Sequence, residues 1–307
     1  MADLILHHYP TSPFSEKVRA ILGYKKLAWK SVHTPTIMPK PDLIALTGGY
    51  RRAPVLQIGA DIYCDSKLIA RVIDRIQPQP PLIPKGTEAS CSIIEQWSET
   101  LFFLTVPVVL RPQGMALFFG KLPPGAAEEF QKDRKALFTG GSGRRPSREL
   151  TESELPAALA QMETQLAAAP FILGNTPSLA DFSLQHAMWF IHANPGVKAH
   201  LEPYPRIRDW TERIMAFGQG EAEKMSGEDA LKIARSSEPA GISGTSSHSQ
   251  LQPGAAITVS ATDYGTDPVT GVLAKADMEE IVLLREDPRA GRVAVHFPRT
   301  GFRLAAA

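Results

Sequence analysis

Ser12 stands where a strand, a tight turn and a helix are expected to meet. The apolar run at residues 4–6 is typical of a short buried strand, and Ser12-Pro13 supplies a capping hydroxyl followed by proline at the first helical position. Backbone N–H groups at a helix start carry partial positive charge and stabilise an anion such as a thiolate. The Ser12 hydroxyl can cap its helix and still donate a hydrogen bond to sulfur.

The energies indicate that the helix terminus needs help from a directed hydroxyl. A thiol of ordinary pKa, about 8.5, must be stabilised by about 2.7 kcal/mol to lose two pKa units. A helix terminus contributes ~0.3–1 kcal/mol, whereas a hydrogen bond to a charged group contributes ~1.5–3 kcal/mol. Ser12 is our first candidate for that hydroxyl, and Tyr9, at the end of the same strand, is the second. A purely capping role for Ser12 is the structural alternative.

Four segments together resemble the cytosolic glutathione transferases. Residues 12–19 (SPFSEKVR) are similar to the active-site segment of the serine- and cysteine-type classes, such as tau and omega. Residues 52–56 (RAPVL) resemble the family's cis-proline segment, and Asp65-Ser66 stands where the family usually has Glu-Ser. Residues 174–181 (GNTPSLAD) are similar to the capping-box turn that opens the central helix of the family's second domain.

The resemblance implies glutathione as co-substrate and assigns roles to individual residues. Ser12 or Tyr9 would activate the thiol, and Ala53, before a cis Pro54, would pair by its backbone with the cysteinyl unit. Asp65 and Ser66 would hold the γ-glutamyl end. Lys40 and Arg52 could meet the glycyl carboxylate, with solvated charges as the alternative for both. The expected glutathione-binding residues are Ser12, Phe14, Lys40, Arg52, Ala53, Pro54, Asp65 and Ser66.

The elements needed to position these residues follow from periodicity and from the resemblance. Residues 1–80 have the order strand, helix, strand, hairpin, helix, which fits an α/β thioredoxin-like domain. Residues 88–235 are mostly of helical pattern and fit the family's all-helical domain. Residues 236–253 read as a linker, and residues 254–307 as a small all-β, barrel-like domain. A hydrophobic pocket beside the thiol could be lined by Trp97, Phe102, Phe103, Met115, Phe118 and Phe119.

Composition restricts the classes of function. The formal net charge of the 307-residue chain is +1, which gives no support to nucleic acid or an anionic membrane as a partner. The apolar run at residues 101–110 is too short to span a bilayer, and no secretory signal is evident, so we expect a cytoplasmic protein. Cys64 and Cys91 form no metal-binding pattern, so no metal is expected.

These observations predict an enzyme that activates glutathione for conjugation to apolar electrophiles or for reduction of a peroxide. By analogy with the family, it is expected to be a homodimer. Two alternatives remain. The protein could bind glutathione or another ligand without turnover, or its β-rich tail could dock a partner protein on a transferase scaffold.

Overall fold

The first domain has the predicted strand and helix order. The computed structural model describes residues 2–119, 124–143, 146–240 and 250–307. Strand β1 pairs in parallel with β2 and antiparallel with β3, which forms a hairpin with β4. The elements are β1 (Ile5–His8), α1 (Pro13–Tyr24), β2 (Ala28–His33), α2 (Pro41–Thr47), β3 (Val55–Ile58), β4 (Asp61–Cys64) and α3 (Ser66–Ile76). This α/β arrangement confirms the thioredoxin-like fold.

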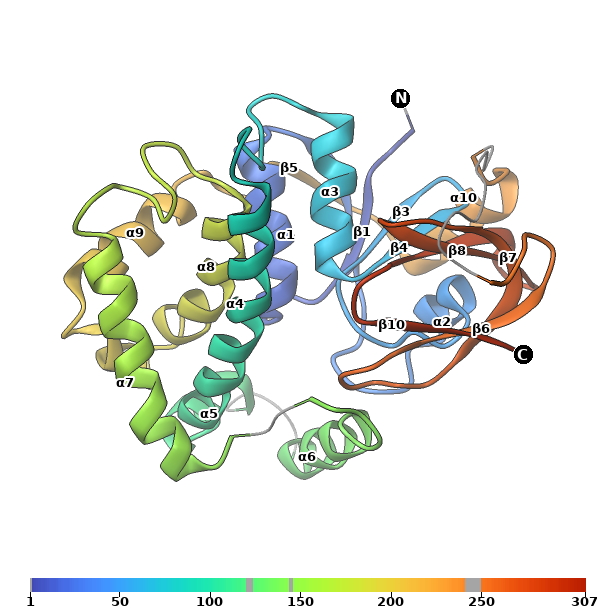
Figure 1. The fold of residues 1–307 in the computed structure, drawn as a ribbon. Coiled ribbons are helices and arrows are strands. Elements are labelled where there is room, and N and C mark those ends of the chain that lie inside the picture. The colour runs from blue at the N-terminus through green and yellow to red at the C-terminus, as the bar shows by residue number, and fades with distance from the viewer. Residues whose placement is uncertain (1, 120–123, 144–145, 241–249) are drawn as a thin grey trace.

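A helical body packs beside this domain (Figure 1). Its elements are α4 (Glu88–Val109), α5 (Pro112–Phe119), α6 (Ala126–Leu137), α7 (Arg148–Gln165), α8 (Leu179–His192), the short 3-10 helix η1 (Lys198–Leu201) and α9 (Pro205–Met215). Helix α8 is buried at the centre and starts with the predicted capping box of Ser178 and Asp181. The Asp181 carboxylate also accepts hydrogen bonds from Ile172 N–H at 2.8 Å and Trp210 Nε1 at 2.9 Å, so this cap holds three segments together.

The helical domain ends earlier than the predicted residue 235. Strand β5 (Glu221–Lys224) returns to the first domain and pairs in parallel with β2. Helix α10 (Gly227–Ser236) then packs on α2 and against the sheet. The sequence Glu-Ala-Glu-Lys has no apolar alternation, because all four residues are exposed on an edge strand, so periodicity could not reveal it.

The C-terminal extension is all-β, as predicted, but it is an outgrowth of the first domain's sheet. Its strands are β6 (Ala256–Ala261), β7 (Val269–Ala276), β8 (Glu280–Asp287), β9 (Gly291–Pro298) and β10 (Phe302–Ala306). Strand β9 pairs in parallel with β4, so one ten-stranded sheet runs in the order β10-β6-β7-β8-β9-β4-β3-β1-β2-β5. The extension is therefore not a separate barrel that begins at residue 254. The backbone groups at the edge of β4 that the first domain leaves unpaired are hydrogen-bonded by β9. Half of the predicted linker, residues 241–249, lies outside the described residues.

The extension curls around α2 and shares a core with it (Figure 1). Leu43 and Leu46 of α2 pack in one apolar cluster with Val293 and Phe297 of β9. The curled strands bury apolar side chains on both elements, and this burial is what joins the extension to the first domain.

A buried histidine joins the two parts of the sheet at the β4–β9 junction. His296 Nδ1 lies 3.0 Å from Glu280 Oε2, and its Nε2 lies 3.1 Å from Asp61 Oδ1. Burial opposes protonation of the ring, but the hydrogen bonds to the two carboxylates outweigh it and raise the pKa of His296. The imidazolium is thus held between one carboxylate of the extension and one of the first domain.

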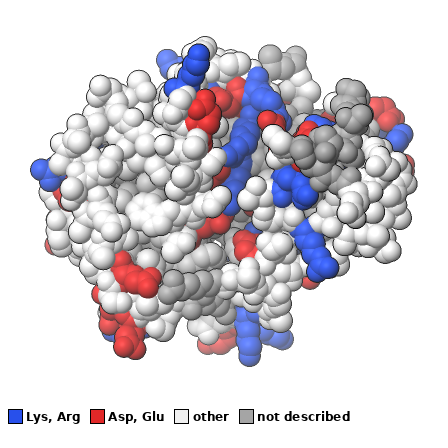
Figure 2. Space-filling view, viewed as in Figure 1, with Lys and Arg blue, Asp and Glu red and all other residues white. Residues whose placement is uncertain are grey.

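Charged side chains of both signs are mixed along the boundary between the helical body and the extension (Figure 2). Two cations of α3 are paired there: Lys67 with Glu99 at 2.7 Å and Arg71 with Glu95 at 2.9 Å. These two pairs offset part of the positive charge that α3 presents on this face. Among the described residues, no helix is long and apolar enough to cross a membrane.

Candidate active site

Ser12 is the N-cap of α1, as predicted from the Ser-Pro pair. Its Oγ accepts a hydrogen bond from Ser15 N–H at 3.2 Å, and Pro13 occupies the first helical turn. The residue is 1% exposed but borders a cavity of about 340 Å³. In the described part of the chain, the Ser12 hydroxyl donates to no protein acceptor, so its proton is available to a ligand in the cavity.

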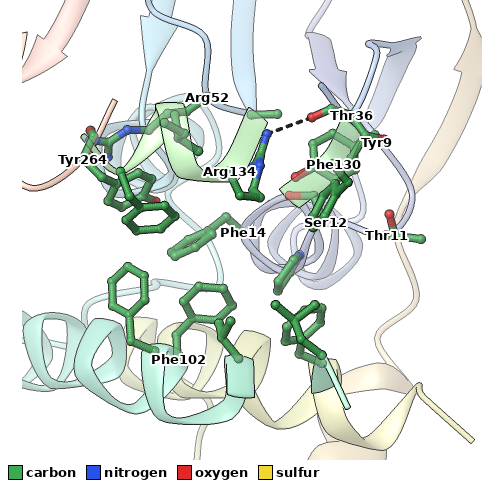
Figure 3. A pocket seen from close by; sticks show the side chains of 18 of the residues that line it. Tyr9, Thr11, Ser12, Phe14, Thr36, Arg52, Phe102, Phe130, Arg134 and Tyr264 are labelled. Carbon is green, nitrogen blue, oxygen red and sulfur yellow. Dashed lines mark hydrogen bonds between the residues drawn. The ribbon is translucent and has the colours of Figure 1, made fainter. Parts of the chain in front are cut away.

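The cavity has a polar side and an aromatic side. Figure 3 shows Tyr9, Thr11, Ser12 and Thr36 on one side, Arg52 and Tyr264 on the other, and Phe14 between them. Five further aromatic residues from several elements also line the cavity: Phe102, Phe103, Phe130, Phe138 and Phe190. A thiolate held at Ser12 would therefore face an apolar compartment suited to an apolar partner.

Lys40 lies in the polar part of the cavity and is only 2% exposed. Its Nζ donates to the Arg51 carbonyl at 3.0 Å and lies 5.6 Å from the centroid of the Tyr9 ring. Burial and the neighbouring Arg134 and Arg51 guanidinium groups, opposed by Asp133, lower the pKa of Lys40 to about 7. Lys40 is therefore not a solvated charge: it is a buried amine whose protonation depends on what occupies the cavity.

Helix α6 closes this part of the cavity through Asp133. The carboxylate of Asp133 accepts a hydrogen bond from Met38 N–H at 3.1 Å and pairs with both Arg51 and Arg134. Arg134 also donates to the Thr36 carbonyl at 3.1 Å (Figure 3). These bonds attach the helical domain to the loop before α2, so the two domains share the wall of the site.

Arg52 is held by the C-terminal extension. Its guanidinium pairs with Asp263, donates to the Tyr264 carbonyl and lies over the Tyr264 ring, 3.7 Å from the centroid. Because of these contacts, the Arg52 side chain is not a solvated charge. It is also not free to meet a glycyl carboxylate. Ala53 borders the cavity, and the Ala53–Pro54 peptide bond is cis, as the resemblance implies.

Asp65 and Ser66 do not border the cavity, although they open α3 as predicted. Asp65 is the N-cap, and its Oδ1 accepts a hydrogen bond from Lys67 N–H at 2.9 Å. Its Oδ2 lies 4.0 Å from Arg52 Nη1. The structure thus brings together Tyr9, Ser12, Phe14, Lys40, Arg52 and Ala53 around one space, while Asp65 is reached from it through the Arg52 side chain.

Sequence reasoning missed the contribution of α6 and of the extension. Phe130, Arg134, Leu137 and Phe138 all border the cavity, and their spacing of four, three and one residues is that of a single helical face, a signal present in the sequence. Tyr264 was recognisable only as part of a turn. No group of His, Cys, Asp or Glu that could hold a metal occurs among the residues described.

Of the aromatic residues expected around the pocket, Phe102 and Phe103 border it. Trp97 instead packs against the main hydrophobic core, and Met115 is not part of the cavity wall. The side chains of Phe118 and Phe119 lie outside the described part of the chain. The pocket wall therefore comes from α4 only in part. The rest is supplied by α1, α6, α8, the loops of the first domain and the extension.

Comparison with known proteins agrees with this architecture. The family description "Glutathione S-transferase, N-terminal domain" matches residues 6–81, and "Glutathione S-transferase, C-terminal domain" matches residues 145–213. A search of curated proteins finds no significant match. A solved GST-like protein from Pseudomonas syringae is 37% identical, with all of both chains covered and a TM-score of 0.83, so the similarity includes the extension.

More distant solved structures share the two-domain fold. A glutathione S-transferase from Sinorhizobium meliloti 1021 is 14% identical, covering 75% of this chain and 93% of its own, with a TM-score of 0.54. One from Rhodospirillum rubrum F11 is 17% identical, covering 69% and 88%, with a TM-score of 0.53. With the full-length match to the Pseudomonas syringae protein and the two domain matches, the chain belongs to the glutathione S-transferase superfamily.

Proposed function

We propose that the protein is a glutathione transferase in which Ser12 donates a hydrogen bond to the thiolate of glutathione. The observation that carries this proposal is the position of the Ser12 hydroxyl at the buried N-terminus of α1, beside the cavity, with its oxygen used as a cap and its proton uncommitted among the described residues. The helix terminus and the directed hydroxyl together supply the stabilisation that a thiolate needs at neutral pH.

The rest of glutathione would follow the cavity wall on both sides of Ser12. The backbone of Ala53, before the cis Pro54, would pair with the cysteinyl unit, and Lys40 would meet the glycyl carboxylate. Phe14 would pack against the cysteinyl side chain. At Asp65 and Ser66, the ammonium group of the γ-glutamyl end would compete with the Arg52 guanidinium for the Asp65 carboxylate.

The reaction is a displacement on the electrophile. The thiolate sulfur attacks an electrophilic carbon, a carbon–sulfur bond forms, and the leaving group departs with its bonding electrons while the thiol proton passes to solvent. With a peroxide, the same thiolate and a second glutathione become the disulfide, and the peroxide is reduced to alcohol and water. The aromatic side of the cavity favours apolar electrophiles.

Three further points belong to the proposal. Tyr9 also borders the cavity and is the alternative activating group. A homodimer in the cytoplasm is what the family analogy favours. The alternative in which the tail is a separate docking module is less favoured, because the extension is built into the sheet and its Tyr264 borders the cavity.

The test is a pair of variants, Ser12→Ala and Tyr9→Phe, assayed for conjugation with a panel of electrophiles and for glutathione binding. Loss of a hydrogen bond to the thiolate should lower kcat/KM about tenfold or more in Ser12→Ala. Tyr9→Phe should retain most of the activity. Full turnover in Ser12→Ala with loss in Tyr9→Phe would reverse the two roles. Glutathione binding without turnover in the wild type would instead favour the non-catalytic binder.

A further inference from the structure

We propose that Tyr264, in the C-terminal extension, forms the end wall of the electrophile pocket and limits it to electrophiles with a single aromatic ring. The proposal rests on the proposed function for the reaction, whereas the shape of the cavity can be tested by binding alone. It gives the extension a part in substrate selection.

The Tyr264 ring is held between two planar groups. The Arg52 guanidinium carbon lies 3.7 Å from its centroid, and the Phe138 ring is stacked on it at 4.7 Å with an interplanar angle of 19°. Two such neighbours can only occupy opposite faces of the ring. Phe103 meets Tyr264 edge-on at 5.8 Å and 89°. These geometries are the favourable ones for cation–π and aromatic pairs, so the ring is fixed in place.

The loop that carries Tyr264 is fixed by its backbone as well. Gly143 N–H donates to the Asp263 carbonyl at 2.7 Å, and Gly265 N–H donates to the Leu137 carbonyl at 2.6 Å. Gly265 has a φ of +55°, and a side chain there would approach Leu137 Cδ1 to 2.9 Å and Arg52 Nε to 3.3 Å. Glycine at this position permits the close approach of the loop to α6. The end wall is therefore held in place both by the contacts of the Tyr264 side chain and by the backbone hydrogen bonds of its loop.

The chemistry of the wall identifies the class of ligand. A row of aromatic contacts leads from Phe14 to Phe102 at 4.7 Å, from Phe102 to Phe103 at 5.4 Å, and from Phe103 to Tyr264. Such a row favours a planar aromatic group between the thiol site and the end wall. The cavity of about 340 Å³ must also hold the part of glutathione beside Ser12, so the space that remains before Tyr264 is small.

Tyr264 acts as a wall and not as a base. The half-buried ring is enclosed by Arg52, Phe138 and Phe103, and this desolvation raises the pKa of Tyr264 above its usual value, so the phenol stays neutral at physiological pH. Tyr264 therefore limits the size of the electrophile that reaches the thiolate. Removal of the ring should change the selectivity between electrophiles of different size more than it changes the rate of the chemical step.

The test uses two electrophiles with the same reacting group, benzyl chloride and the three-ring chloromethylanthracene. In each, the thiolate forms a bond to the CH₂ carbon, chloride leaves with the electron pair of the broken carbon–chlorine bond, and the thiol proton goes to solvent. The measured quantity is the ratio of kcat/KM for the larger to the smaller electrophile. It is compared in the wild type, Tyr264→Ala, Tyr264→Trp, Tyr264→Phe and the control Tyr204→Ala, whose side chain is not part of the cavity wall.

We expect Tyr264→Ala to raise the ratio about tenfold or more, Tyr264→Trp to lower it, and Tyr264→Phe and Tyr204→Ala to leave it unchanged. An unchanged ratio in both Tyr264→Ala and Tyr264→Trp, with wild-type circular dichroism, would overturn the proposal.

Binding separates failure of this proposal from failure of the proposed function. If the wild type conjugates neither electrophile, the transferase function fails, and the affinities for anthracene carboxylate and benzoate replace the kinetic ratio. Tighter relative binding of anthracene carboxylate in Tyr264→Ala than in the wild type supports the end wall. Equal relative binding in the two proteins refutes it.

Discussion

Lys40 predicts a pH dependence of ligand binding that can be calculated from the structure. Burial and two arginines lower the pKa of the free amine to about 7, and Lys40 would meet the glycyl carboxylate of glutathione. A carboxylate beside the amine favours its charged form, so binding takes up a proton above this pKa. Well above this pKa each pH unit costs about 1.36 kcal/mol, so the affinity at about pH 8.5 should be about thirtyfold lower than its plateau at low pH.

The assay is calorimetric titration with S-methylglutathione, which has no thiol proton to complicate the balance. Below about pH 7 the affinity should be nearly constant, because Lys40 is already charged. Lys40→Arg keeps its charge and should bind with little dependence on pH. Lys40→Met should bind more weakly at about pH 6 by roughly tenfold or more, and with a flatter profile. A wild-type affinity that rises with pH, or the same slope in Lys40→Met, would refute the reasoning.

Two predictions concern stability. The pKa of His296 is raised in the folded state. Its contribution to the free energy of unfolding is therefore complete below the unfolded-state pKa of about 6.5 and is lost as pH rises through the folded-state pKa. Urea unfolding of His296→Gln should therefore show a larger deficit in the free energy of unfolding at about pH 6 than at about pH 9, and an equal deficit would contradict the buried ion pair with Asp61. Asp181→Ala leaves the buried Trp210 indole and backbone donors without an acceptor, so it should cost roughly 3–5 kcal/mol, measured as a lower urea midpoint. Binding of S-methylglutathione by the folded Asp181→Ala protein should be unchanged.

Local signals were sufficient to predict three features of the fold. The Ser-Pro pair predicted the cap of α1, the alternation in residues 55–64 predicted the β3–β4 hairpin, and the Ser178–Asp181 spacing predicted the capping box. Each of these depends on residues within one turn or one hairpin. Their physical causes are therefore contained in a short stretch of sequence.

Long-range partners were not available from the sequence. Arg52 could be recognised as a charge near the cis proline, but its partner Asp263 is 211 residues away. Likewise, nothing local in β9 indicates that it pairs with β4, because edge strands pair through backbone groups that every residue carries. The position of Tyr264 in the cavity follows from both of these pairings, so the sequence alone could not place it there.

The central claim is that a thiolate is stabilised at the N-terminus of α1 by the Ser12 hydroxyl, and the pKa of bound glutathione tests it most directly. The thiolate absorbs in the ultraviolet, so a pH titration of the complex reports that pKa. We predict a value about two units below the solution value of about 8.5 in the wild type, rising by about one to two units in Ser12→Ala. A bound thiol that titrates near its solution value in the wild type, or that stays equally acidic without the Ser12 hydroxyl, would contradict the account.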